Sequence, residues 1–188
     1  MKLYLVRHGQ TDWNNERRMQ GHKNIPMNEV GIQQINDLAD RIKKEDIRFD
    51  RLICSSLDRA KKSAEIIKDK TGYKNDIIID EDFIERSNGL LEGEVWTPEL
   101  DFDDPKYQIE TIPELCKRAE RAVGKYTFGE DENVMIVAHG AILAAVRTVL
   151  SEYRIGFFDK EAQIIQGNIL VYDKEEGKEP TFYNCFDN

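Results

Sequence analysis

Short aliphatic runs alternate with amphipathic stretches along most of this chain, and this alternation constrains its fold more than any other feature. Six runs rich in β-branched, aliphatic or aromatic residues have the length of strands: Lys2–Val6, Arg51–Ser55, Ile77–Asp80, Val134–Ala138, Ile169–Tyr172 and Phe182–Phe186. Between most of them, apolar residues recur at the spacing of one helix face. The pattern is typical of a layered α/β fold built on a sheet.

Apolar residues at helical spacing predict four helices, which span about 35–42, 57–67, 115–126 and 142–150. Before the third helix, Thr111 and Glu114 have the spacing of a capping box, and Pro113 stands in the first turn. The last two strands are separated by residues 173–180, which are too few for a crossover helix. We therefore expect these two strands to be antiparallel.

The stretch from about 87 to 112 follows neither the strand period nor the helix period. It contains glycines, prolines and many acidic residues. We expect one domain, residues 1–188, with this stretch as a lid-like excursion over the sheet edge, because long loops in compact domains are often lids or binding loops. Trp96 within it is interpreted either as a substrate platform or as a packing residue of the lid.

Charge and composition narrow the classes of partner. The chain has 27 basic and 36 acidic residues, a net charge of −9, which disfavours nucleic acid and anionic membranes. No apolar run approaches the ~20 residues of a membrane span. The charged pair Arg7-His8 interrupts the first apolar run, so we expect no secretory leader. Three widely spaced cysteines form neither a disulfide framework nor a zinc motif, and we expect a cytoplasmic protein.

A histidine followed by a glycine stands just beyond each of two predicted strands, at His8-Gly9 and at His139-Gly140. Ligands bind at the carboxyl ends of strands in open α/β sheets, and glycine lets a ligand approach the backbone closely. The histidines are therefore expected to share one site rather than to cap backbone separately. A metal site is the alternative, but no HExxH motif or Cys/His cluster is present and Arg7 would repel a cation. We expect no metal.

An anion suits this edge better than a cation. Arg7 precedes the first histidine, and Arg59 follows the second major strand, where Ser55 and Ser56 are candidate N-caps of a helix that points its positive end to the same edge. Arginine can bond two phosphate oxygens at once. A neutral imidazole is a competent nucleophile at phosphorus, and the leaving alkoxide then needs a proton from an acid. Composition alone does not select that acid among the 36 present.

The segment Leu5-Val6-Arg7-His8-Gly9-Gln10-Thr11-Asp12-Trp13-Asn14 resembles the signature of the histidine phosphatase superfamily, which includes the cofactor-dependent phosphoglycerate mutases. Further matches follow in the family's order, at residues 20–21, 26–31, 55–60, 84–93 and 137–141. Together they span about three quarters of the chain. The resemblance implies a three-layer α/β/α sandwich with a mostly parallel mixed sheet. It implies neither a metal nor an organic cofactor.

The resemblance also implies a role for individual residues. His8 would be the nucleophile that forms a phosphohistidine, and Glu85 would protonate the leaving group and later activate water. The remaining catalytic side chains would hold the phosphoryl oxygens: Arg7, Arg59 and His139. Further substrate contacts are expected from Asn14, Gln20, Gly21 and Arg86. His22 is interpreted as a surface loop residue.

The segment between Glu85 and His139 bears on the reaction type. It is only 54 positions long, and residues 87–112 hold Lys106 but no arginine, whereas the family's mutases carry a long basic insertion here. A short, acidic loop leaves a phosphoenzyme open to water. We therefore expect a metal-independent phosphomonoesterase acting on a small phosphorylated metabolite, such as a sugar phosphate or α-ribazole phosphate. The alternatives are a cofactor-dependent phosphoglycerate mutase and a non-enzymatic phospho-ligand binding module.

Overall fold

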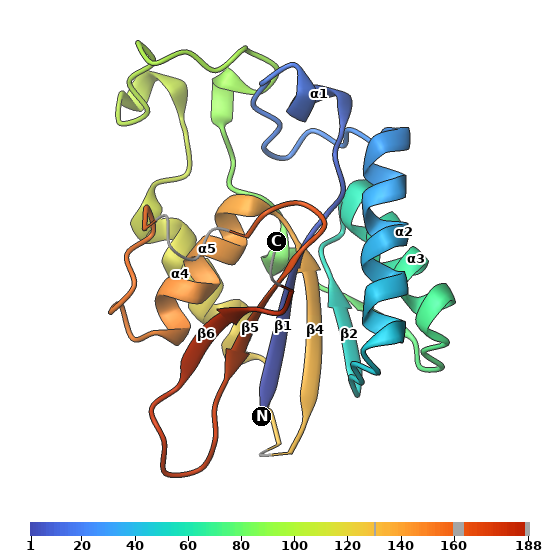
Figure 1. Ribbon diagram of the computed structural model, residues 1–188. Helices are drawn as coiled ribbons and strands as arrows, with labels where there is room; N and C mark the ends of the chain where they lie inside the picture. Colours follow the sequence, from blue (N-terminus) through green and yellow to red (C-terminus); the bar gives the residue numbers. More distant parts are fainter. Residues whose placement is uncertain (130, 160–163, 187–188) are drawn as a thin grey trace.

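A computed structural model describes residues 1–129, 131–159 and 164–186. In this part of the chain a six-stranded sheet forms the centre, with the strand order β3-β2-β4-β1-β5-β6 (Figure 1). The strands are β1 (Lys2–Arg7), β2 (Arg51–Cys54), β3 (Ile77–Ile79), β4 (Asn133–Ala138), β5 (Ile169–Asp173) and β6 (Thr181–Asn184). The pairs β1·β4, β2·β4 and β2·β3 are parallel, and β1·β5 and β5·β6 are antiparallel.

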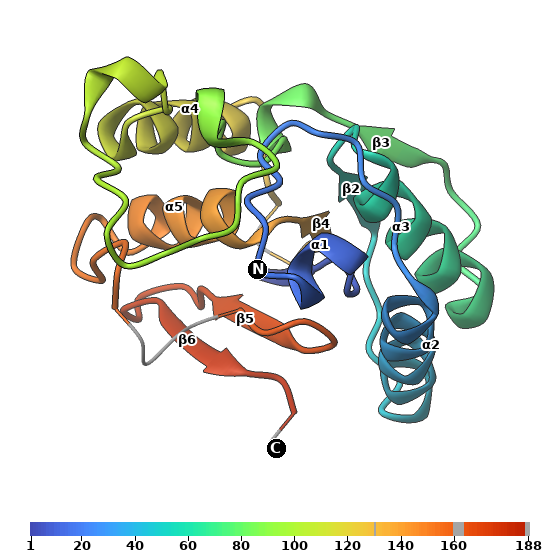
Figure 2. The same ribbon diagram turned by 90° about the horizontal axis from the view of Figure 1, so that it is seen from above.

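Helices cover both faces of the sheet, as Figure 2 shows from above. On one side lie α2 (Glu29–Lys44) and α3 (Asp58–Thr71), and on the other lie α4 (Ile112–Gly124) and α5 (Gly140–Leu150). The short elements are α1 (Asp12–Asn15), η1 (Glu81–Phe83), η2 (Gly89–Leu91) and η3 (Pro105–Tyr107). The predicted three-layer sandwich with a mostly parallel mixed sheet is confirmed.

The core explains why β1 reads as a continuous apolar run. Leu3 and Leu5 pack into the cluster under α4 and α5, whereas Tyr4 and Val6 pack into the cluster under α2 and α3. Successive side chains of a strand point to opposite faces, so a strand covered on both sides needs apolar residues throughout. Two cores, one on each face, therefore fix β1 at the centre of the sheet.

The six strands and the four long helices lie where the sequence predicted them, and the antiparallel pairing of the last two strands is confirmed. The capping box at Thr111 and Glu114 is present at the start of α4. This helix ends earlier than expected, because Tyr126 lies beyond its C-terminus and donates its hydroxyl proton to Asp80. The additional short elements fall in segments that have no clear period.

The expected serine cap of α3 is wrong. Leu57 is the N-cap residue, and no side chain caps the helix there. Ser55 Oγ accepts from the Leu57 N–H and contacts the His139 ring, while Ser56 donates to Glu81. Both serine hydroxyls are thus engaged away from the first turn of α3.

The excursion after β3 lies above the carboxyl ends of the strands, beside α1 (Figure 1). Its middle is tied to the segment after α1, where Val95 bridges Arg18 and the Gly93 N–H donates to the Met19 carbonyl. Trp96 belongs to this part and is half-exposed. Among the described residues, no helix has both the length and the apolar character to cross a membrane.

Candidate active site

The two histidines meet at the carboxyl ends of β1 and β4, as the sequence predicted. These central strands are parallel, with Arg7 opposite Ala138 in the register, and the His8 N–H donates to the Ala138 carbonyl at 3.0 Å. The ring centroids of His8 and His139 are 5.0 Å apart. Both side chains are buried. Adjacent parallel strands therefore bring residues 131 positions apart in the sequence into contact.

The His8 ring is held in its neutral form. Its Nδ1 lies 2.7 Å from the Gly9 carbonyl, which can only accept, so Nδ1 carries the proton. Nε2 keeps its lone pair and has no hydrogen-bond partner among the described residues. Burial holds the pKa of His8 well below 6.5, and the positive charges of Arg59 and Arg7 lower it further. The ring is therefore uncharged at neutral pH.

A close contact between two backbone segments fixes the loop that carries His8. A Cβ atom on Gly9 would lie 2.2 Å from the Gly31 carbonyl oxygen, and one on Gly31 would lie 2.1 Å from the Gln10 carbonyl oxygen. Gly31 belongs to the first turn of α2, whose N-cap is Asn28. The motif at residues 26–31 thus serves the site by letting α2 pack directly against the His8 loop.

Arg59 projects from the first turn of α3 and is 1% exposed. Its Nη1 donates to the Lys23 carbonyl at 2.7 Å, its Nη2 to the Gly21 carbonyl at 3.0 Å, and its Nε to His139 Nδ1 at 3.2 Å. A guanidinium has five N–H donors, so two remain for a ligand. Burial lowers the pKa of Arg59 to about 10, and the group stays positively charged at neutral pH.

Gly21 tolerates no side chain at this position. Its φ is +50°, and an added Cβ would lie 2.1 Å from Glu92 Oε1. The turn directs its carbonyl oxygen to Arg59, which holds the loop in place.

Arg7 presents a buried guanidinium without a complete set of partners. Its Nε is buried and has no hydrogen-bond partner among the described residues. Burial lowers the pKa of Arg7, and the nearby Glu85 opposes that shift. The Arg7 side chain lines the cavity described below, where its terminal N–H groups can donate to an oxyanion.

His139 joins Arg59 and Ser55 in a buried chain of hydrogen bonds. Its Nδ1 accepts from Arg59, so its proton is on Nε2, which donates to Ser55 Oγ at 2.7 Å. Burial, followed by the neighbouring His8 and Arg59, holds the pKa of His139 well below 6.5. The ring is therefore neutral, and its Nδ1 accepts a hydrogen bond that helps to orient the Arg59 guanidinium.

Glu85 lies across the N-terminus of α5. Its Oε1 accepts from the backbone N–H groups of Arg86, Ala141 and Ile142 at 2.9, 3.1 and 3.1 Å. The N-cap residue of α5 supplies no side-chain cap, so the Glu85 carboxylate takes that place. Within the described part of the chain, Oε2 makes a single long contact, 3.4 Å to the Ala141 nitrogen, and is the oxygen left to carry or accept a proton.

Two side-chain amides complete the polar lining. Asn14 Oδ1 accepts from the Thr11 N–H and from Gln166 Nε2, and Thr11 Oγ1 donates toward Gln20 Oε1 at 3.0 Å. With both amide oxygens held, the NH₂ groups of Asn14 and Gln20 have no partner among the described residues and can donate to an anion. Gln166 comes from the segment before β5, and no motif in the sequence indicated it.

One cavity of about 210 Å³ brings the predicted residues together. Eight of them line it: Arg7, His8, Asn14, Gln20, Gly21, Arg59, Glu85 and Arg86. His139 lies behind this lining. Four lining residues that the sequence had not assigned to the site are Arg18, Asn88, Ala141 and Phe157. Among the described lining residues Glu85 is the only carboxylate, so the cavity favours a small anion.

Two further predictions concern residues near the cavity. His22 is exposed, as expected, but its Nε2 also donates to the Glu85 carbonyl at 2.8 Å. Trp96 is not among the cavity lining. In the described part of the chain, no group of three or more His, Cys, Asp or Glu side chains is arranged to hold a metal ion.

Comparisons with known proteins agree on one family. The model of the histidine phosphatase superfamily (branch 1) matches residues 3–180. A Bacillus subtilis relative, named uncharacterized phosphatase PhoE, is 36% identical over 151 residues, covering 78% of this chain and 76% of its own. Phosphoglycerate mutase-like protein 4 of Arabidopsis thaliana is 31% identical over 162 residues, covering 77% and 69%. The solved structure of a phosphoserine phosphatase mutant from Entamoeba histolytica, in complex with phosphoserine, has a TM-score of 0.77 and 26% identity, covering 96% of this chain and 94% of that one.

Proposed function

Because this chain belongs to the histidine phosphatase superfamily, we propose that it is a phosphomonoester hydrolase that works through a phosphohistidine on His8. One observation carries the proposal: the unshared Nε2 lone pair of a neutral His8 adjoins the incompletely partnered Arg7 guanidinium in the same cavity. The nucleophile and the anion-binding group are thus held together. Metal independence is part of the proposal, since the arginines supply the positive charge that the reaction needs.

In the first half-reaction, His8 Nε2 attacks the phosphorus, and a P–N bond forms as the ester P–O bond breaks. Arg7 and the two remaining N–H groups of Arg59 stabilise charge on the phosphoryl oxygens. The NH₂ groups of Asn14 and Gln20 add neutral donors. The leaving oxygen takes its proton from Glu85, and the product alcohol departs.

In the second half-reaction, the Glu85 carboxylate accepts a proton from water as that water attacks the phosphorus. The P–N bond breaks, phosphate is released, and the electron pair returns to His8 Nε2. The proton stays on His8 Nδ1 throughout and is donated to the Gly9 carbonyl oxygen, so the tautomer is ready for the next cycle. In this scheme His139 acts by orienting Arg59.

The proposed substrate is a small phosphorylated metabolite, such as a sugar phosphate or α-ribazole phosphate. The small cavity suits a single phosphoryl group, and the overall charge of −9 disfavours polyanions. A cytoplasmic location accords with three free cysteines. Phosphoglycerate mutase is the second candidate, because one relative is named phosphoglycerate mutase-like protein 4. A pure binding module is less favoured, since His8 and Glu85 both line the cavity.

The test is turnover of p-nitrophenyl phosphate by the wild type and by His8→Ala, with and without a chelator. We expect the substitution to reduce turnover by about a thousandfold or more and to abolish the acid-labile phosphoenzyme. Turnover retained in His8→Ala would show that another residue is the nucleophile, and loss of wild-type activity with chelator would contradict metal independence. Isomerisation of 3-phosphoglycerate faster than phosphate release would establish the mutase.

A further inference from the structure

Arg118 is a nearly buried arginine that the mechanism above does not use. It lies in the middle of α4, its side chain is 12% exposed, and it is not among the residues that line the cavity. A charged group in such a position needs strong partners. Its partners all belong to the segment that carries Glu85 or to a residue that binds that segment.

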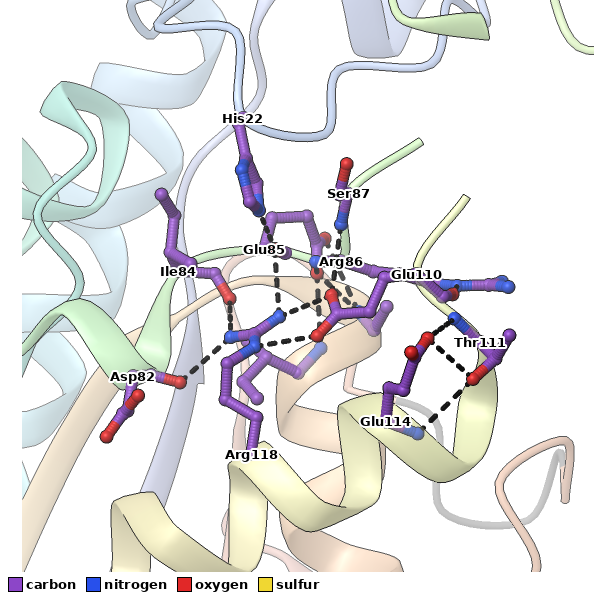
Figure 3. Close-up of polar contacts among 12 residues, drawn as sticks. His22, Asp82, Ile84, Glu85, Arg86, Ser87, Glu110, Thr111, Glu114 and Arg118 are labelled. Carbon is purple, nitrogen blue, oxygen red and sulfur yellow. Dashed lines mark hydrogen bonds and ion pairs between the residues drawn. The ribbon is translucent and has the colours of Figure 1, made fainter. Parts of the chain in front are cut away.

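All five N–H donors of the Arg118 guanidinium are used, as Figure 3 shows. Nη1 donates to the carbonyl oxygens of Asp82 and Ile84, at 2.9 and 2.6 Å. Nη2 donates to the Glu85 carbonyl at 3.1 Å and to Glu110 Oε2 at 2.7 Å, and Nε donates to Glu110 Oε1 at 2.8 Å. No donor is left for a substrate.

Glu110 extends this contact to the residues that follow Glu85. Its Oε2 accepts from the Ser87 N–H at 3.1 Å, and its own N–H donates to the Ser87 carbonyl at 3.0 Å. Arg86 Nε donates to the Glu110 carbonyl at 2.6 Å. The pair Arg118–Glu110 therefore holds the chain on both sides of Glu85.

The Glu85 segment has little structure of its own. It follows η1, and residues 84–88 belong to neither a helix nor a strand. The Glu85 carboxylate nevertheless has to reach the N–H groups of Ala141 and Ile142 on α5. A catalytic group on a loop keeps its geometry only when surrounding hydrogen bonds fix it.

We propose that Arg118, paired with Glu110, is a positioning residue that holds the Glu85 carboxylate against the start of α5, within reach of the leaving oxygen. The inference rests on the proposed role of Glu85 as the proton donor. Lysine cannot replace Arg118, because a point-like ammonium lacks the planar fork that bonds three carbonyls and a carboxylate at once.

Leaving-group dependence separates this role from a general structural one. Proton donation matters most for an alkyl leaving group, which is a poor one, and least for p-nitrophenolate, which leaves without help. kcat/KM reports the steps up to phosphoenzyme formation. A misplaced Glu85 therefore lowers kcat/KM for β-glycerol phosphate selectively and leaves the inhibition constant of inorganic phosphate unchanged.

The variant is Arg118→Lys, and Arg121→Gln on the same helix is the matched control. Arg121 bonds the Asp82 carboxylate rather than backbone, and its side chain is 57% exposed. For Arg118→Lys we expect kcat/KM to fall about tenfold or more with β-glycerol phosphate and less than about threefold with p-nitrophenyl phosphate. Glu85→Gln, which removes the acid itself, should show the largest difference between the losses of kcat/KM with the two esters. Arg121→Gln should have the wild-type kcat/KM with both.

Amide hydrogen exchange gives a second readout that does not depend on turnover. In Arg118→Lys the N–H groups of Ala141 and Ile142 should exchange faster, because they lose their Glu85 acceptor. Should Arg118→Lys fail to fold, Glu110→Gln is judged by the same two criteria, since it removes the charge that pairs with Arg118.

Selective loss with the alkyl ester together with faster exchange at Ala141 and Ile142 supports the inference. Equal losses with both esters, or unchanged selectivity and exchange in a folded variant, would overturn it. If the wild type hydrolyses neither ester, the proposed function is wrong, and the exchange measurement alone then decides whether Arg118 holds Glu85 in place.

Discussion

At the scale of the residue, the site depends on a histidine that is kept uncharged. Because the pKa of His8 is lowered by burial and by two arginines, we expect its imidazole resonances to show no protonation between about pH 8 and about pH 6. NMR of the side-chain nitrogens in the free enzyme checks this and also reads the tautomer, which should carry the proton on Nδ1.

The matched variant is Arg59→Gln, which removes a nearby positive charge. The pKa of His8 should then rise, and protonation should begin at a higher pH than in the wild type. A His8 ring that is already protonated near neutral pH in the wild type would contradict the assignment of the nucleophile.

Individual site residues differ in how visible they are in the sequence. His8 and His139 could be predicted because each ends a strand, and Glu85 because it sits in a family motif. Gln166 could not be predicted, because it lies 152 positions from its partner Asn14 and in no motif. In the sequence alone, Arg118 looks like one of many charged residues on the exposed face of a helix. Only the fold brings its guanidinium to the Glu85 segment.

At the scale of the element, the approach of α2 to the His8 loop depends on a glycine. Gly31→Ala would place a Cβ 2.1 Å from the Gln10 carbonyl oxygen, so the helix start and the loop have to separate. We expect a loss of roughly 1–3 kcal/mol in the free energy of unfolding. kcat/KM for p-nitrophenyl phosphate should fall as well, since the displaced loop carries His8, the proposed nucleophile.

Urea denaturation and steady-state kinetics measure both effects. The control is Gly124→Ala at the end of α4, where an added Cβ meets no atom within 4 Å. That variant should be as stable as the wild type or slightly more so, with the same activity. Wild-type stability and kinetics in Gly31→Ala would mean that the close approach is not needed.

The elements themselves were predictable because period and burial coincide in them. The run Leu3–Val6 has no polar interruption, as a strand covered on both faces requires. The start of α3 was not predictable, because Ser55 satisfies the usual preference for a cap but is committed to His139. Local propensity was overridden there by a contact between two side chains that are far apart in the sequence and follow neighbouring strands.

At the scale of the whole molecule, the two buried histidines make stability depend on pH. Both have pKa values well below 6.5 in the folded protein, whereas in the unfolded chain they return to about 6.5. Below that pH the unfolded state binds more protons than the folded state. The two histidines therefore do not weaken the fold above about pH 6.5, and the free energy of unfolding falls as the pH drops below that value. Each histidine contributes a slope of about 1.4 kcal/mol per pH unit until its folded-state pKa is reached.

Urea denaturation in steps from about pH 7.5 to about pH 5 checks this dependence. Replacing His139 by a residue that does not titrate should reduce the slope by about 1.4 kcal/mol per pH unit, which corresponds to one proton, whatever its effect on the absolute stability. A free energy of unfolding that stays constant over this range in the wild type would show that the rings are not kept neutral by the fold.

The residues that line the cavity come from two kinds of structural element. His8 follows a buried strand and Arg59 lies in the first turn of a helix, whereas Asn88 and Phe157 at the same cavity come from connecting segments. The segment around Val95 is joined to the rest by backbone bonds near Arg18 and Met19. A duplicated gene could therefore lengthen, shorten or exchange this segment and acquire a new substrate preference, while the inherited chemistry beneath it stays intact.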